Sequence, residues 1–325
     1  MKLGRRRFLH LAAGVAAPPA VARIARAQAY PTRPVRIIVG FGAGGGADIT
    51  ARLIGQWLSE RLGQSFITEN RPGASGNIGT EAVVRAPADG YTLLLVESAN
   101  AVNVTLYEKL NFNFTRDIAP VASIMRVPLV ILVNPSFPAK TLPEFIAYTK
   151  ANPGMVNMAS GGNGTPPHMS GEQFKMMAGV NMVHVPYRGQ GPALSDLIGG
   201  QVQVLFATTP GSTDYVRSGK LHALAITTAS RAEIFPDLRT VEDFVPGYEA
   251  SEWYGIGAPK NTPPGIIDML NEEINAALAD PKMKDRFTDF GATPLVLSPA
   301  NFGKLIADET EKWAKVIRAA SIKGD

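Results

Sequence analysis

Short apolar segments alternate with longer amphipathic segments along most of this 325-residue chain. Ile37-Ile38-Val39 predicts a strand, since an unbroken run of β-branched apolar residues is typical of strands covered on both faces. The segment from Ile49 to Leu62 carries apolar residues at helical spacing and ends at Gly63, a residue that commonly stops helices. A strand, a glycine loop and a helix therefore follow one another early in the chain.

The same alternation predicts further elements. Strands are expected at residues 66–70, 91–96, 127–133, 156–159, 182–185, 202–206, 223–227 and 253–258. Helices are expected at residues 78–85, 142–151, 167–178, 263–279 and 299–320. Thr141 with Glu144, and Ser298 before Pro299, supply helix-start signals. The pattern predicts an α/β fold with mostly parallel strands, in which loops at the carboxyl ends of strands are candidate ligand contacts.

The first glycine loop, residues 40–46, holds five glycines directly after a strand. One interpretation is the dinucleotide pattern G-x-G-x-x-G/A at residues 42–47, with Glu69 as the ribose-binding acid. A second is a small carboxylate held by backbone N–H groups at the helix start. A third is a tight turn without a ligand. This segment alone leaves all three open.

Two more loops of this kind occur later in the chain. Residues 160–165 (SGGNGT) follow a predicted strand and precede a helix, and residues 185–192 (VPYRGQGP) do the same. A dinucleotide enzyme needs one such loop and a catalytic apparatus. Several loops spread over both halves of the chain favour instead a ligand enclosed between two lobes.

Recognisable catalytic motifs are missing from the sequence. G-x-S-x-G, H-E-x-x-H and the phosphate-binding P-loop do not occur, and the chain has no cysteine, which excludes disulfides and a thiolate nucleophile. His168, His184 and His222 lie too far apart in sequence to predict a metal site. Arg188 is a candidate cation for an acidic ligand, although a solvated arginine is the plain alternative. His168 and Tyr187 could reach a ligand or pack structurally.

The first 29 residues predict an export signal. Arg5-Arg6-Arg7-Phe8-Leu9 fits the twin-arginine pattern, and Ala25, Ala27 and Ala29 offer cleavage sites after an alanine-rich segment. This leader holds 6 of the 32 basic residues, so the remaining chain has 26 basic and 28 acidic residues and a net charge of −2. The basic balance of the full chain is therefore no argument for nucleic-acid binding, and a periplasmic location is expected.

Many motifs of the chain together resemble the Bug-type receptors of tripartite tricarboxylate transporters. They are YPTRP at 30–34, GGGAD at 44–48, ENRPGASGNIG at 69–79, DGYTLL at 89–94, ANPG at 151–154, GNGT at 162–165, HVPYRG at 184–189, GGQV at 199–202, SGKL at 218–221 and WYG at 253–255. The resemblance implies a two-lobed periplasmic-binding-protein fold of type II. It also implies a carboxylate ligand held mainly by backbone N–H groups, hydroxyls and water, and transient partnership with membrane transporter subunits.

The resulting prediction is a monomeric receptor without a cofactor or metal. Its lobes are expected at residues 30–126 plus 251–325 and at residues 127–250, joined by two crossovers. An exported NAD- or FAD-dependent oxidoreductase that uses residues 42–47 is the alternative. The expected ligand residues are Phe41, Gly42, Gly44, Gly45, Gly46, Ala47, Asp48, Ser98, Ser160, Gly161, Asn163, Gly164, Thr165, His168, Tyr187, Arg188, Gly189, Ala207 and Thr208.

Two positions depart from the pattern that the resemblance implies. Ala47 stands where the family usually has a hydroxyl residue, so the first loop should be one donor poorer. Ala207 stands where the family often has an aspartate. A valine at Gly45 is expected to impair binding more than loss of Arg188, because a side chain should block the glycine conformation and the close approach of the ligand.

Overall fold

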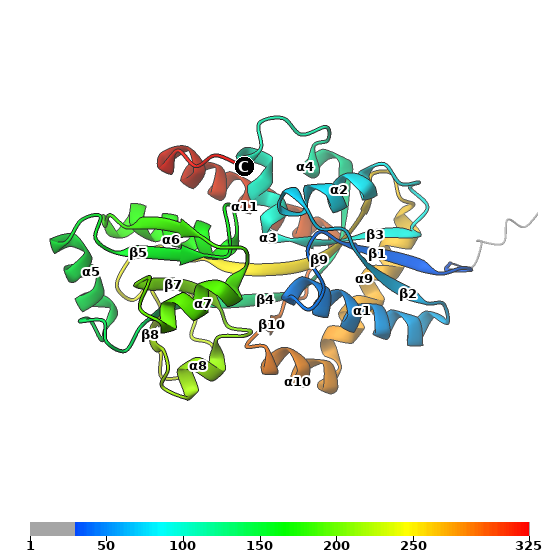
Figure 1. The fold of residues 1–325 in the computed structure, drawn as a ribbon. Coiled ribbons are helices and arrows are strands. Elements are labelled where there is room, and N and C mark those ends of the chain that lie inside the picture. Colours follow the sequence, from blue (N-terminus) through cyan, green and yellow to red (C-terminus); the bar gives the residue numbers. More distant parts are fainter. Residues whose placement is uncertain (1–29, 325) are drawn as a thin grey trace, which may run out of the picture. The chain divides into compact units, whose positions relative to one another are not determined.

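The computed structural model describes residues 30–324, and the predicted leader lies outside them. Its strands form one hydrogen-bonded network with two parts that share a long central strand, β4 (Ile118–Val133) (Figure 1). Sheet A consists, in spatial order, of β2 (Phe66–Asn70), β1 (Val35–Val39), β3 (Thr92–Glu97), β9 (Ser251–Pro259), β4 and β10 (Thr293–Pro294). Sheet B consists of β8 (His222–Ile226), β4, β7 (Val204–Thr208), β5 (Asn157–Ser160) and β6 (Val183–Pro186).

Strand direction changes around β4 and β9. The outer strands pair in parallel: β1 with β2 and β3, and β5 with β6 and β7. β9 runs antiparallel to β3 and β4, and β4 runs antiparallel to β7 and β8. Residues 118–128 of β4 pair with β9, whereas residues 129–133 pair with β7, so β4 leaves sheet A and enters sheet B within one strand.

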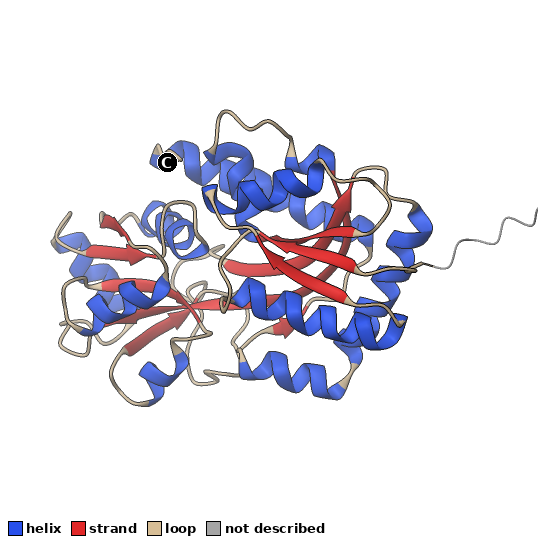
Figure 2. Ribbon diagram, turned by 45° about the vertical axis from the view of Figure 1, so that its right-hand side comes forward, coloured by secondary structure: helices blue, strands red, loops and turns tan. Residues whose placement is uncertain are grey.

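Helices lie on both sides of the strands (Figure 2). They are α1 (Gly46–Leu62), α2 (Asn77–Val84), α3 (Ser98–Leu106), α4 (Phe114–Asp117), α5 (Leu142–Ala151), α6 (Pro166–Ala178), α7 (Gln190–Ile198), α8 (Thr213–Arg217), α9 (Pro264–Ala279), α10 (Pro281–Asp289) and α11 (Pro299–Ala320), with a short 3₁₀ turn η1 (Ala74–Gly76). Within the described residues, none of these helices has the length and apolar character needed to cross a membrane.

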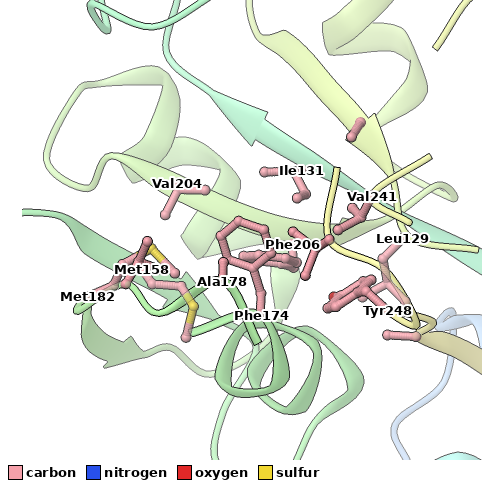
Figure 3. Packing of buried hydrophobic residues seen from close by; sticks show 14 of the residues in the cluster. Leu129, Ile131, Met158, Phe174, Ala178, Met182, Val204, Phe206, Val241 and Tyr248 are labelled. Atoms are coloured by element: carbon pink, nitrogen blue, oxygen red, sulfur yellow. The ribbon is translucent and has the colours of Figure 1, made fainter. Parts of the chain in front are cut away.

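Alternation along the strands of sheet B separates two hydrophobic clusters. Ile131 and Phe206 belong to the cluster covered by α5, α6 and α11, in which Phe174 and Tyr248 pack edge to face (Figure 3). Leu205 and its neighbours on the opposite face belong to the cluster covered by α7. Because successive side chains of a strand point to opposite faces, a strand covered on both sides must be apolar throughout.

The structure extends the predicted elements at several points. β4 begins nine residues before the predicted strand at 127–133, because Pro120 and polar residues interrupt the apolar run without ending the pairing to β9. α3 and α10 were not anticipated. α3 is buried over most of its surface, so its sequence lacks the polar stripe that marks an amphipathic helix. α11 agrees with its prediction, and the Ser298 side chain caps it.

Candidate ligand-binding site

The first glycine loop exposes an uncapped helix start. α1 begins after Gly45, which offers no side-chain cap, and no hydrogen bond is recorded for the N–H groups of Gly46, Ala47 or Asp48 in the described residues. The first N–H groups of a helix have no partner within the helix and carry partial positive charge. This end of α1 can therefore donate to an anion.

The loop has one internal tie of its own. Gly44 N–H donates to the Asp48 carboxylate at 2.9 Å, and Arg52 forms an ion pair with the same carboxylate at 2.9 Å. The hydrogen bond from Arg52 is the largest cause that holds the pKa of Asp48 below its usual value. The Asp48 side chain is thus occupied by the loop that it fixes, and only its backbone N–H remains for a ligand.

Gly44 and Gly46, rather than Gly45, are the positions that require glycine. Gly44 has φ +84°, a conformation that side chains disfavour. A Cβ on Gly46 would lie 2.7 Å from the Tyr254 hydroxyl oxygen. Gly45 has φ −82°, and its Cβ would meet only the Gly42 carbonyl at 3.8 Å. The prediction that a side chain at Gly45 would block a glycine conformation is therefore wrong, because the backbone there is extended; that it would obstruct the approach of the ligand stays a prediction.

A bridge that the sequence did not predict links the first loop to α3. Phe41 accepts a hydrogen bond on its carbonyl from the Asn70 amide at 3.0 Å, and its ring lies against Gly76. The Asn103 side chain of α3 donates to the Ser75 carbonyl at 2.7 Å. Ser75 holds φ +50°, so this bridge keeps a non-glycine residue in a left-handed conformation.

The start of α3 contributes a second set of donors. The Glu97 side chain accepts from the Asn100 backbone N–H, and the Asn100 side chain accepts in turn from Glu97 N–H at 2.9 Å, a reciprocal cap. Ser98 is buried at 2 % exposure, and its hydroxyl has no hydrogen-bond partner within the described residues. Since buried polar groups are normally paired, this hydroxyl is available to a bound water or ligand.

Two acids and a tyrosine lie beneath the first loop. Glu97 is directly opposite Tyr254 in the antiparallel register of β3 and β9. Burial raises the pKa of Glu97 well above its usual value, and the nearby Glu252 carboxylate raises it further. Burial raises the pKa of Glu252 to about 7, although a hydrogen bond from Tyr254 opposes the shift. Burial likewise raises the pKa of Tyr254.

The second glycine loop, residues 160–165, uses most of its polar groups internally. Gly162 N–H donates to the Ser160 hydroxyl at 3.1 Å, and the Thr165 hydroxyl donates to the Gly162 carbonyl at 2.7 Å. Gly164 N–H donates to His168 Nδ1 at 3.1 Å. Pro166 and Pro167, the first residues of α6, have no N–H to offer. This loop therefore has fewer free donors than its glycine content suggests.

A pair of stacked histidines supports that loop. The rings of His168 and His184 are 3.7 Å apart and inclined by 10°, and His184 Nε2 is 2.6 Å from the Ser160 hydroxyl. Because His168 Nδ1 accepts from Gly164, its proton is on Nε2. Burial is the largest cause that lowers the pKa of His168 to about 3, and His184 and Lys175 contribute to the same shift. Burial lowers the pKa of His184 to about 4, so both rings are neutral at neutral pH.

The third loop is tied to the second. Tyr187 N–H donates to the Ser160 carbonyl at 3.0 Å, and Gly189 N–H donates to the Gly161 carbonyl at 3.1 Å. The Tyr187 hydroxyl donates to Asp196 at 2.6 Å, and this bond is the largest cause raising the pKa of Tyr187 to about 12. Its hydroxyl is thus engaged within its own helix-loop unit. Arg188 is exposed, and no ion pair is recorded for it in the described part of the chain.

Two predicted ligand residues at the carboxyl end of β7, Ala207 and Thr208, have different surroundings. Ala207 is fully buried in the hydrophobic cluster covered by α7. Thr208 is half-buried, and its hydroxyl and its N–H both lie within 2.9 Å of the Gln190 side-chain oxygen at the start of α7. An aspartate at position 207 would therefore enter an apolar cluster in this structure.

The predicted residues thus form two groups. The first loop and Ser98 lie on sheet A, and the second and third loops with Thr208 lie on sheet B. Gly164 packs against Leu106 of α3 so closely that a Cβ would overlap it, which brings the second loop to the helix that carries Ser98. Glu97, Glu252 and Tyr254 lie near the start of α1 but are not among the predicted ligand residues, because no local pattern indicates that β9 approaches the first loop.

One cavity within the described residues lies away from the three loops. A cavity of about 240 Å³ is lined by residues of β4, α10 and the segment 228–234, among them Arg126, Glu249 and Gly291. Arg126 and Glu249 form an ion pair there at 2.8 Å. None of the ligand residues predicted from the sequence lines this cavity, so the ligand site rests on the geometry of the loops.

Residues 50–322 match the protein family described as the tripartite tricarboxylate transporter family receptor, TctC. This chain belongs to that family. It is 39% identical to BugT of Bordetella pertussis over an alignment of 314 residues. The alignment covers 96% of this chain and 94% of BugT. The predicted family resemblance is thereby confirmed.

Solved structures of family receptors share the fold. The R. palustris protein Rpa4515, solved with adipate, is 36% identical, with a TM-score of 0.83 over 90% of this chain and 99% of that protein. MatC of Rhodopseudomonas palustris, solved with malate, is 32% identical, with a TM-score of 0.78 over 89% and 100%. The periplasmic binding protein BugD is 33% identical, with a TM-score of 0.79 over 90% and 99%. The two-lobed periplasmic-binding-protein fold is confirmed.

Proposed function

We propose that this receptor captures a small organic acid as its carboxylate in the periplasm and delivers it to membrane subunits of a tripartite tricarboxylate transporter. The observation that carries the proposal is the uncapped start of α1: within the described residues, no hydrogen bond is recorded for the N–H groups of Gly46 and Ala47. The relatives solved with adipate and malate support a carboxylate as the ligand class.

The donors suit a carboxylate held without a salt bridge. Backbone N–H groups at a helix start donate charge-assisted hydrogen bonds, each worth about 1.5–3 kcal/mol. Arg188 then assists carboxylate binding from the third loop, which belongs to the group of predicted residues on sheet B. Lobes at residues 30–126 plus 251–325 and at 127–250 would close on the ligand by bending at β4 and β9, and the receptor acts as a monomer.

The proposed receptor binds and releases its ligand without chemistry. The histidine nearest to a hydroxyl, His184, contacts Ser160, which is fully buried and already bonded within its loop, so this pair is a support for the loop. NAD- or FAD-dependent chemistry at residues 42–47 is the competing function. The two differ in which compound binds to the purified protein.

Calorimetric titration of the exported protein with adipate, malate, NAD and FAD tests the proposal. We expect one organic acid site per chain and no dinucleotide binding. Tight binding of NAD or FAD without binding of any acid in a wider carboxylate panel would overturn it. Sequencing the amino terminus of periplasmic protein is expected to show cleavage within residues 25–29, whereas an intact terminus in the cytoplasm contradicts the export step.

A further inference from the structure

Glu252 lies where β4 and β9 pass from one sheet to the other. It pairs with Val127, two residues before β4 begins its pairing with sheet B at Leu129. Its neighbour Trp253 faces α11, where it packs edge to face on Phe302. Since successive side chains of a strand point to opposite faces, Glu252 and Tyr254 share the face away from α11.

That face leads directly to the first glycine loop. The Tyr254 hydroxyl lies against Gly46, the first residue of α1, and donates a hydrogen bond to Glu252. Glu97 stands opposite Tyr254 on β3, and the unpartnered, buried Ser98 hydroxyl follows it in the chain. Two carboxyl groups and a phenol therefore lie together next to Gly46, where a carboxylate ligand would dock.

No cation is placed against these two acids in the described residues. The charged and titratable side chains on the elements that pack against β9 are engaged elsewhere: Asp48 with Arg52, Glu81 with Arg85, Glu249 with Arg126 and Lys312, Glu309 with Lys312, and Glu172 with Lys175 and His168. Arg126 pairs with Trp253 in the register, so its side chain is on the α11 face. Burial without a cation is why the pKa of Glu252 reaches about 7.

We propose that Glu252 is a ligand-site residue that takes up one proton when the carboxylate binds, so that the receptor captures its ligand as an anion together with a proton. The inference rests on the proposed function. An ionised Glu252 would repel a carboxylate docked at Gly46, whereas the neutral acid would not. The ligand therefore favours protonation: the proton comes from solvent and adds to the Glu252 carboxylate, with Tyr254 as its hydrogen-bond partner.

Proton uptake makes the affinity depend on pH in a defined direction. Above pH 7, Glu252 is mostly ionised in the free receptor and must be protonated on binding. Linkage then requires the affinity to fall as pH rises, approaching about tenfold per pH unit for one proton. His168 and His184 do not titrate in this range, because their pKa values lie near 3 and 4.

The first experiment measures protons on the wild-type receptor. Titration with adipate and malate at pH 7.5 and 8.5, in buffers with different ionisation enthalpies, gives the number of protons taken up per ligand. We expect uptake that rises towards one proton at pH 8.5. Binding of a carboxylate with no proton uptake overturns this inference and leaves the proposed function intact. Failure of every carboxylate to bind overturns both.

Two variants assign the proton. Glu252→Gln mimics the neutral acid, so its affinity should be independent of pH from 6 to 9 and should exceed that of the wild type at pH 8.5. Glu272→Gln makes the same change at an exposed position of α9 and should keep the pH dependence of the wild type. A pH dependence that survives in Glu252→Gln contradicts the assignment. If that variant does not fold, carbon-13 NMR of the wild-type glutamate carboxyls decides, because a Glu252 resonance that keeps one charge state on ligand addition overturns the proposal.

Discussion

The two glycine loops of this receptor differ in how their hydrogen bonds are directed. In the first loop, residues 40–46, the Gly44 N–H donates to the Asp48 side chain, and the start of α1 is left open. The second loop, residues 160–165, bonds to itself and to the buried His168 and His184, and α6 begins with two prolines. The first loop therefore offers backbone N–H donors to a ligand, whereas the second loop uses its N–H groups mainly in hydrogen bonds with its own neighbours.

Glycine content gives a loop its conformational freedom but does not decide whether the loop binds a ligand. The free N–H groups of the first loop remain because Gly45 has no side chain that could cap α1. In the second loop, neighbouring hydroxyls and imidazoles take the N–H groups that the glycines expose. The side chains around a loop therefore decide whether its backbone can bind a ligand.

The largest expected effect is an opposite response of the two regions to pH. The pKa of Glu252 is raised to about 7, so its contribution to stability is present below the unfolded value and is lost as pH rises through 7. The loss is about 3 kcal/mol at 1.36 kcal/mol per pKa unit. The pKa of His184 is lowered to about 4, so stability is lost as pH falls from 6.5 towards 4.

Urea unfolding from pH 4 to 9 measures both effects. Glu252→Gln should remove the loss of unfolding free energy that occurs as pH rises from 4.5 to 7, and His184→Gln should remove the loss that occurs as pH falls from 6.5 towards 4. His222→Gln, at a partly exposed imidazole bonded to the Lys140 carbonyl, is the control. Identical pH profiles for the wild type and both variants would show that the two regions do not differ in this way.

Gly46→Val should weaken ligand binding at the first glycine loop. Its Cβ would lie 2.7 Å from the Tyr254 hydroxyl and would push the start of α1 away from β9. We expect a loss of about 2 kcal/mol of binding free energy, roughly thirtyfold in Kd, in titrations with the same carboxylate. Gly265→Val is the matched control, because it changes the second residue of α9, where nothing lies within 4 Å. Equal affinities for the two variants would place the ligand elsewhere.

Ser160→Ala should destabilise the second glycine loop and leave the first one unaffected. The change removes the hydroxyl shared by Gly162 and His184, so the free energy of unfolding should fall by about 1–2 kcal/mol. Ligand affinity should change less than the stability does. A double-mutant cycle with His184→Ala is expected to show a coupling of about 1 kcal/mol. A purely additive cycle would mean that the serine and histidine act separately.

The smallest expected effect belongs to Arg188. Its guanidinium is exposed and carries no recorded ion pair among the described residues, so Arg188→Ala should lower affinity about threefold at low salt and less at high salt. Arg217→Ala, an exposed arginine in α8, is the control. Complete loss of binding in Arg188→Ala would make a salt bridge, rather than the start of α1, the main anchor of the ligand.

The sequence by itself determined the fold class, the family and the positions of the three loops. The strand at Ile37-Ile38-Val39 and the helices after each loop are local patterns, and local patterns depend on residues close together in the chain. It did not determine which loop has donors to spare. Gly45 was singled out for its place in the motif, whereas the structure shows that Gly44 and Gly46 carry the constraints.

Tertiary structure alone decided what surrounds those loops. Tyr254 meets Gly46 across more than 200 residues of chain because β9 enters the sheet beside β3, and the register of β3 and β9 places Glu97 opposite Tyr254. His184 reaches Ser160 because β5 and β6 pair in parallel. Such contacts are set by strand order and register, which no local pattern encodes. The burial that raises the pKa of Glu252 and lowers that of His184 exists only once the sheets and helices have packed.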